Sequence, residues 1–181
     1  MKAAFVDRDG VINEPVWDTD SFESPYRPED VALVPGAAAG LRRLRDAGFA
    51  LVLVSNQPAA AKGKATHEAL DAVHERVVDA LRIEDVQLDG VYYCHHHPDF
   101  TGPCECRKPA PGLLLRAADE LGLQLSESWM IGDADTDVAA AHAAGAHAVL
   151  VAHPQTAHRR NGAVGDLAAP DLAGAAALIA S

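Results

Sequence analysis

Two aspartates stand one residue apart near the start of the chain, directly after a short apolar run. Asp7 and Asp9 follow residues 3–6 and precede Gly10. The apolar run predicts a buried parallel strand, which would carry both carboxylates to its carboxyl end, where open α/β sheets place their active sites. One carboxylate can attack phosphorus there, and the other can handle the proton. Asp-x-Asp also occurs in turns and calcium loops, so this hypothesis depends on the rest of the chain.

Three later strand ends carry polar residues suited to the same chemistry. Ser55 follows the apolar run 50–54, Arg107 and Lys108 follow the third predicted strand, and Asp133 follows the fourth. A serine hydroxyl with nearby backbone N–H groups can bind phosphoryl oxygens, and a lysine adds positive charge. Each residue alone has an ordinary alternative, as a turn cap, a loop hydroxyl or a solvated lysine. Four such strand ends in this order favour one shared site.

Together these residues predict a phosphoryl-transfer reaction in which a side chain of the protein carries the phosphoryl group. Asp7 would attack phosphorus and form an aspartyl-phosphate, while Asp9 would protonate the leaving oxygen and later activate water. A magnesium ion needs oxygen ligands, for which Asp7, Asp133 and a backbone carbonyl are the candidates. The predicted catalytic residues are therefore Asp7, Asp9, Ser55 and Lys108.

The four segments resemble the motifs of the haloacid dehalogenase-like phosphohydrolases. Asp-x-Asp-Gly-Val, Val-Ser-Asn, Arg-Lys-Pro and Gly-Asp-x-x-x-Asp all occur in order, and the resemblance covers residues 3–151. It implies a Rossmann-like parallel sheet, a magnesium requirement and Asp7 as the nucleophile. It also implies that the backbone oxygen of Asp9 and the side chain of Asp133 complete the metal site, with Asp137 in a supporting position.

Strand-like runs alternate with helical patterns along the chain, which predicts an α/β fold with a parallel sheet and helices on both faces. We expect one domain over 1–181 with a minimal cap. Two long loops, 13–34 and 94–108, interrupt the alternation, and the tail 153–170 is expected to be irregular. The predicted strands are 3–6, 50–54, 90–93, 129–131 and 148–151, and the predicted helices are 36–48, 66–81, 111–122, 138–145 and 172–179.

All three cysteines lie in the second long loop, beside a run of histidines. Cys94, Cys104 and Cys106 surround His95, His96 and His97 in a segment of 13 residues. Cys-x-His followed by Cys-x-Cys offers four ligands, enough for tetrahedral zinc. Free thiols in a polar loop are the ordinary alternative, and a catalytic zinc would need an open coordination position. The spacing does not say which histidine binds.

A narrower resemblance selects the zinc ligands. The loop is similar to the zinc loop of the heptose bisphosphate phosphatases and histidinol-phosphate phosphatases, and this similarity implies Cys94, His96, Cys104 and Cys106 as ligands. A structural zinc would then fix the loop and aim Arg107 and Lys108 at the substrate.

The same resemblance suggests a small phosphorylated sugar as the substrate, with the 7-phosphate of D-glycero-D-manno-heptose 1,7-bisphosphate as the leading choice. Histidinol phosphate or another small sugar phosphate is the alternative. Lys62 or Lys64 could meet a distal phosphate. Ala134 stands where these relatives carry lysine or arginine, so the positive charge expected there is absent. The implied substrate-binding residues are Pro15, Val16, Trp17, Asp18, Asn56, Gln57 and Arg107.

Composition limits the partners. A net charge of −11 argues against a nucleic-acid partner, including the substrate of a polynucleotide 3′-phosphatase that would share these motifs. No apolar run approaches the ~20 residues of a membrane span, and the N-terminus does not resemble a signal peptide. We therefore expect a cytoplasmic protein, and a monomer because no exposed apolar stripe is evident.

Two alternatives come from other classes of protein. A zinc-stabilised binding module without catalysis would not need Asp7, Asp9, Lys108 and Asp133 together. A phospho-acceptor signalling domain also uses an aspartate and magnesium at strand ends, but it needs neither Asp9 nor the cysteine loop.

Overall fold

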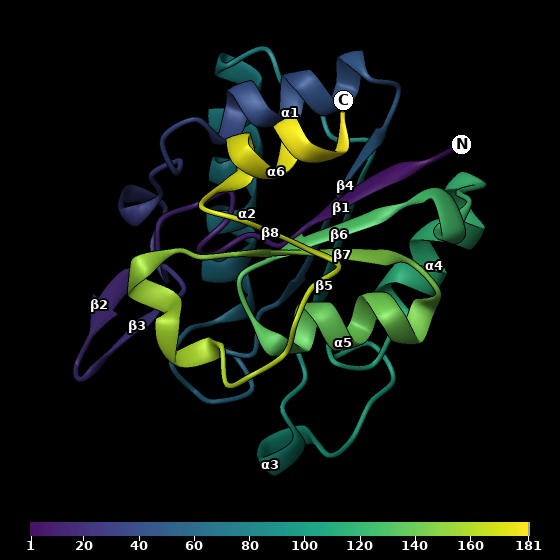
Figure 1. Cartoon of the computed structure of the whole chain (residues 1–181). Coiled ribbons are helices and arrows are strands. Elements are labelled where there is room, and N and C mark those ends of the chain that lie inside the picture. The colour runs from purple at the N-terminus through teal and green to yellow at the C-terminus, as the bar shows by residue number, and fades with distance from the viewer. Residues whose placement is uncertain (181) are drawn as a thin grey trace.

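A six-stranded parallel sheet forms the centre of the computed structural model, which describes residues 1–180. The strand order is β5-β4-β1-β6-β7-β8, so the chain moves outward on one side of β1 and then returns to its other side (Figure 1). The carboxyl ends of β1 and β6 therefore flank the point where the strand order reverses, the usual place for a binding site. The strands are β1 (Ala3–Val6), β4 (Ala50–Asn56), β5 (Gly90–Cys94), β6 (Trp129–Gly132), β7 (His147–Val151) and β8 (Leu167–Ala169).

Helices cover both faces of the sheet, as predicted. The first strand shows why: Ala4 and Val6 pack into one buried apolar cluster, whereas Ala3 and Phe5 pack into the other. A strand that is buried on both faces reads as a continuous apolar run. The first cluster lies under α1 (Ala37–Asp46), α2 (His67–Ile83) and α6 (Leu172–Ile179), and the second under α4 (Gly112–Leu121) and α5 (Asp135–Ala144) (Figure 1).

Local signals account for most helix ends. The Thr66 side chain accepts a hydrogen bond from Ala69 N at 3.1 Å, which caps α2 as expected. Gly122 and Gly145 end α4 and α5 in the left-handed conformation. The start of α5 was predicted too late. This helix begins at Asp135 rather than residue 138, because the Asp137 carboxylate accepts from Ala134 N at 3.1 Å and closes the first turn.

Two segments hold more structure than their composition predicts. The loop 13–34 contains a hairpin, β2 (Val16–Asp18) and β3 (Ser21–Glu23), and a short helix η1 (Pro28–Asp30); the hairpin projects from one side of the sheet (Figure 1). The prediction that the tail 153–170 is irregular was wrong. This tail contains η3 (Pro154–Arg159) and the edge strand β8, which pairs with β7. A three-residue strand is too short for its periodicity to be recognised.

The remaining short elements are α3 (Pro98–Thr101), inside the cysteine loop, and η2 (Leu125–Glu127). Within residues 1–180, no helix combines the length and the apolar character needed to cross a membrane.

Candidate active site

Three aspartates meet at the point where the strand order reverses. Asp7 follows β1, Asp133 follows the neighbouring β6, and Asp137 lies in the first turn of α5. One carboxylate oxygen from each lies within 4.8 Å of the others. They form part of the wall of a cavity of about 310 Å³, which also has Asp9, Ser55 and Lys108 in its lining. The structure thus brings together the four polar strand ends that the sequence analysis singled out.

Gly10 lets the loop after β1 pass close to this cluster. Its φ is +93°, and a Cβ at this position would lie 2.4 Å from Asp133 Oδ2. A side chain here would therefore strain the backbone and push Asp133 away. The glycine of the Asp-x-Asp-Gly motif is thus required by the packing of the site itself.

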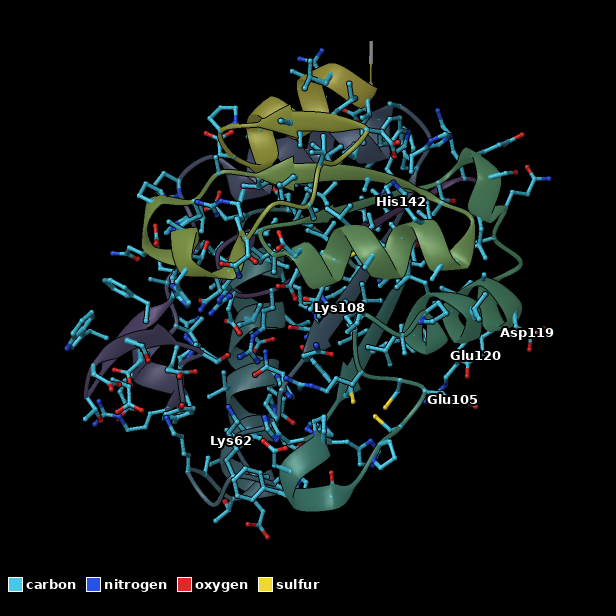
Figure 2. All side chains as sticks on the ribbon, turned by 60° about the horizontal axis from the view of Figure 1, so that its bottom comes forward. Lys62, Glu105, Lys108, Asp119, Glu120 and His142 are labelled. Carbon is cyan, nitrogen blue, oxygen red and sulfur yellow. The ribbon has the colours of Figure 1, made fainter. Side chains whose placement is uncertain are left out.

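Lys108, labelled in Figure 2, is the cation at the centre of the cluster. Only 2% of it is exposed. Its Nζ lies 3.0 Å from Asp7 Oδ1 and 2.6 Å from Asp137 Oδ1, and it donates to the Val54 carbonyl at 3.0 Å. Burial alone would lower the pKa of Lys108, but the charges of Asp137 and Asp7 raise it above its ordinary value. Lys108 therefore stays charged.

Asn56 fixes the backbone of Lys108. Its Nδ2 donates to Lys108 O at 2.9 Å, and its Oδ1 accepts from Lys108 N at 3.0 Å. We expected Asn56 to contact the substrate. It does reach the cavity, but both ends of its amide are engaged in positioning the lysine.

Asp9 is held in a buried hydrogen-bond network. Arg8 donates to both of its carboxylate oxygens, at 3.0 and 2.9 Å, and Gln57 Nε2 donates to Oδ2 at 2.7 Å. Burial alone would raise the pKa of Asp9, but the Arg8 guanidinium reverses this and holds it below its ordinary value. Asp9 is therefore ionised in this arrangement, and Gln57, which was expected to touch the substrate, instead binds Asp9.

The Arg8 guanidinium also forms a hydrogen bond with a histidine. It is fully buried, and its Nη1 lies 2.7 Å from Nδ1 of His74, whose ring stacks on Tyr93 at 3.5 Å. Burial, followed by the charge of Arg8, lowers the pKa of His74 to about 3. His74 is therefore neutral and can accept the hydrogen bond from Arg8.

The other expected substrate-binding residues are divided between two places. Arg107 lines the cavity, together with Ser24 of the loop after β3. Val16, Trp17 and Asp18 instead line a second cavity of about 500 Å³, beneath the hairpin. Pro15 is buried at the base of the hairpin. The structure therefore does not bring the segment 15–18 into the cavity that holds Asp7.

The oxygen donors of the cluster fit a hard divalent cation. Asp133 is fully buried, and its Oδ1 has no hydrogen-bond partner among the described residues. Burial, followed by the charge of Asp7, raises the pKa of Asp133 to about 7. A buried carboxylate oxygen left without a partner is costly, and a metal ion would satisfy it. Asp7, Asp133 and the Asp9 carbonyl can supply such ligands.

The cysteine loop forms a second cluster of possible metal ligands. Cys94, His96, Cys104 and Cys106 each offer one ligand atom within 4.8 Å of the others. The Cys94 sulfur lies 3.7 Å from Cys104 and 2.9 Å from Cys106, and His96 Nδ1 lies 3.2 Å from Cys106. Figure 2 shows yellow sulfur atoms close together beside Glu105. Zinc–sulfur bonds of about 2.3 Å in tetrahedral geometry separate sulfurs by about 3.8 Å. The Cys94–Cys104 distance matches this separation, whereas the Cys94 and Cys106 sulfurs lie closer together, so the donor set fits zinc by the type and number of its atoms.

The two clusters are physically linked, because Arg107 follows directly after Cys106 and precedes Lys108. Its Nη1 also donates to the His96 carbonyl at 3.1 Å. His97, which the resemblance leaves out of the ligand set, accepts from Asp99 N at 3.3 Å and caps α3 instead.

Two residues of the site were missed by the sequence analysis. Arg8 was treated only as the spacer between two aspartates, although its position in Asp-x-Asp was a usable signal. Arg159 lies in the tail that was expected to be irregular. Its Nη1 donates to the Asp9 carbonyl at 3.0 Å and to Asp133 Oδ2 at 3.3 Å. No local pattern around Arg159 indicated this contact.

Known proteins resemble this chain in sequence and in structure. The sequence profile of a family described as HAD-hydrolase-like matches residues 105–175. A D-glycero-beta-D-manno-heptose-1,7-bisphosphate 7-phosphatase from Yersinia pestis is 41% identical over 152 residues, which cover 80% of this chain and 76% of that protein. The enzyme of the same name from Escherichia coli strain K12 is also 41% identical, with 80% of this chain and 75% of that protein covered.

A solved structure shares the whole fold. The crystal structure of D,D-heptose 1,7-bisphosphate phosphatase from B. bronchiseptica, in complex with magnesium and phosphate, superposes with a TM-score of 0.85. It is 30% identical, and the match covers 99% of this chain and 98% of that one. Sequence and structure comparisons thus agree with each other and with the four motifs. The chain therefore belongs to the HAD-like hydrolases, as a phosphoric monoester hydrolase related to the heptose bisphosphate phosphatases.

Proposed function

We propose that this protein removes the 7-phosphate of D-glycero-D-manno-heptose 1,7-bisphosphate in a magnesium-dependent reaction. One observation carries the proposal. A buried carboxylate–lysine centre is joined, through adjacent residues, to a loop with four zinc-type ligands. The named relatives, at 41% identity, supply the substrate class.

Asp7 is the proposed nucleophile. Its carboxylate oxygen bonds to phosphorus as the bond from phosphorus to the sugar oxygen breaks, which gives an aspartyl-phosphate and a sugar oxygen that takes up a proton. Water then attacks this phosphorus, so inorganic phosphate leaves and Asp7 is regenerated. Lys108 and Ser55 line the cavity and are placed to bind the phosphoryl oxygens.

Asp9 is the proposed acid and base. Its bonds to Arg8 and Gln57 keep it ionised, a state suited to the second step, in which it accepts a proton from the attacking water. For the first step Asp9 must hold a proton, and this requires its carboxylate to turn away from Arg8. The two roles would thus correspond to two positions of one side chain.

Asp7, Asp133 and the carbonyl of Asp9 are the proposed magnesium ligands. Bound there, the metal would supply positive charge that offsets the carboxylate nucleophile and the substrate phosphate. Cys94, His96, Cys104 and Cys106 are the proposed ligands of a structural zinc, which would hold Arg107 and Lys108 in place. We also propose that the protein is a cytoplasmic monomer and that its partner is a small sugar phosphate.

Histidinol phosphate, or another small monophosphate, is a second candidate because of one observation. Ala134 lines the cavity where the relatives' lysine or arginine would add a charge, so a second phosphate has one partner fewer.

Phosphate release in the presence of magnesium tests both candidates. The panel holds both anomers of the heptose 1,7-bisphosphate, histidinol phosphate, fructose 1,6-bisphosphate and a 3′-phosphorylated oligonucleotide, with Asp7→Asn as the blank. We expect a strong preference for one heptose anomer. A preference for histidinol phosphate would select the second candidate, and weak activity on every ester would reject both.

A further inference from the structure

Arg159 contacts the atoms that are proposed to bind magnesium, and nothing in the proposed reaction uses this contact. Its Nη1 lies 3.0 Å from the Asp9 carbonyl oxygen and 3.3 Å from Asp133 Oδ2. Both residues are proposed to hold magnesium, so the guanidinium occupies one lone pair of the Asp9 carbonyl and one of Asp133 Oδ2 that the metal could use. Asp133 Oδ1 has no hydrogen-bond partner among the described residues and stays open to the metal.

The segment that carries Arg159 is firmly attached to the site. The neighbouring Arg160 donates to the carbonyls of Asp133 and His153, at 3.3 and 2.9 Å, and Thr156 is fully buried. The side chain of Arg159 itself is only 21% exposed. The helix η3 therefore delivers this guanidinium to the carboxylates as a built feature.

The charges around the cavity explain why a cation is needed there. Four carboxylates, Asp7, Asp9, Asp133 and Asp137, face two other contacting cations: Lys108 pairs with Asp7 and Asp137, and Arg8 pairs with Asp9. Within residues 1–180, Asp133 forms an ion pair with Arg159 alone. Like charges held together in a buried site raise the free energy of the folded protein, and the guanidinium reduces that cost.

We propose that Arg159 competes with the divalent cation for the Asp9 carbonyl and the Asp133 carboxylate, so that the guanidinium lowers the magnesium affinity of the site. The inference rests on the proposed metal site. It means that η3, an element outside the four motifs, influences the magnesium affinity.

Magnesium affinity, measured by calorimetry with magnesium chloride and no phosphate, tests the competition. The protein retains its zinc and is freed of magnesium beforehand. The variant Arg159→Met should bind magnesium at least about fivefold more tightly than the parent, the lower end of a typical coupling between two ligands of one site. Lys62→Met is the matched control, because Lys62 lines the same cavity without contacting Asp9 or Asp133. It should change the affinity less than twofold.

Three outcomes would reject parts of the scheme separately. An unchanged or weaker affinity of Arg159→Met overturns the competition, and an equal gain in Lys62→Met would reduce it to a general charge effect. Asp133→Asn should abolish binding. If it does not, the proposed metal site fails, and the proposed reaction fails with it.

A second measurement does not depend on how well Arg159→Met folds. The side-chain Nε–Hε NMR signal of Arg159, assigned by its absence in Arg159→Lys, should shift as magnesium chloride is added to the unmodified protein. A signal that stays in place at saturating magnesium would overturn the proposal.

Discussion

The carboxylate centre and the cysteine loop are both sets of metal-type ligands, but they are held together differently. In the carboxylate centre, each negative group faces a cation of the protein: Lys108 for Asp7, and Arg159 for Asp133. The ligands of the cysteine loop face one another, with Cys94 and Cys106 sulfurs 2.9 Å apart.

Their supports differ as well. The carboxylates extend from the ends of buried strands, and Asp133 and Lys108 are almost completely buried. Of the four ligands in the loop, only Cys94 is buried, at the end of β5. The other three lie on a segment that contains the four-residue helix α3. We infer that the sheet positions the carboxylates by itself, whereas the cysteine loop needs its metal in order to keep its shape.

The largest effect should come from removing the nucleophile without disturbing either region. Asp7→Asn should lower phosphate release by at least about 10³-fold, because an amide cannot form the aspartyl-phosphate. Lys108 keeps its ion pair with Asp137, so the zinc content and the fold should be retained. The measurement is steady-state phosphate release, with Asp20→Asn at the exposed hairpin tip as the control. Turnover retained in Asp7→Asn would overturn the assignment of the nucleophile.

A smaller effect should follow from breaking the cysteine loop. Cys104→Ser should lose stoichiometric zinc and lower activity by about 10- to 100-fold, because Arg107 and Lys108 lose their anchor. Magnesium affinity should stay unchanged, since the sheet still holds Asp7 and Asp133. Metal analysis, calorimetry and limited proteolysis of the segment 94–108 check the three parts.

His97→Ala is the control for that experiment, because His97 lies in the same loop but caps α3. It should keep the zinc. Full zinc content in Cys104→Ser would show that Cys104 is not a required zinc ligand. Loss of magnesium binding along with the zinc would show that the carboxylate centre depends on the cysteine loop.

The parts of the site that lie at strand ends could be predicted from the sequence. The family resemblance implies that the strands before Asp7 and Asp133 are neighbours, and neighbouring parallel strands end at the same edge of the sheet, so the two carboxylates were expected to lie close together. The same reasoning predicted the sheet and the helices on both faces. Helix caps such as Thr66 were predicted because they act within four residues.

The parts that depend on distant contacts could not be predicted. Arg159 and Asp9 are 150 residues apart, and nothing in the sequence around Arg159 indicates that the two meet. Asn56 looked like a substrate contact because it follows a strand, but its amide binds the backbone of Lys108, which is 52 residues away. Such pairings become visible only once the fold places the segments side by side.

The last expected effect concerns how the stability of each region depends on pH. The pKa of Asp133 is raised to about 7 in the folded protein, above the value of about 3.9 of an exposed aspartate. Between these two values the unfolded chain has released the proton that the folded protein keeps. Without magnesium, stability should therefore fall as the pH rises from 4 to 7, with a contribution from Asp133 of at most about 1.4 kcal/mol per pH unit.

Denaturant unfolding at pH 5 and pH 8 measures this slope, and Asp133→Asn should remove the part that Asp133 contributes, whereas Asp20→Asn should not. The cysteine loop should respond in the opposite direction: its ligands bind zinc only when deprotonated, so it should lose metal and stability as the pH falls. Opposite slopes would show that the two regions are stabilised by different means. If the unfolding free energy of Asp133→Asn changes with pH as steeply as that of the parent, Arg159 already keeps Asp133 ionised. The charges of the carboxylate centre would then be compensated without a proton on Asp133.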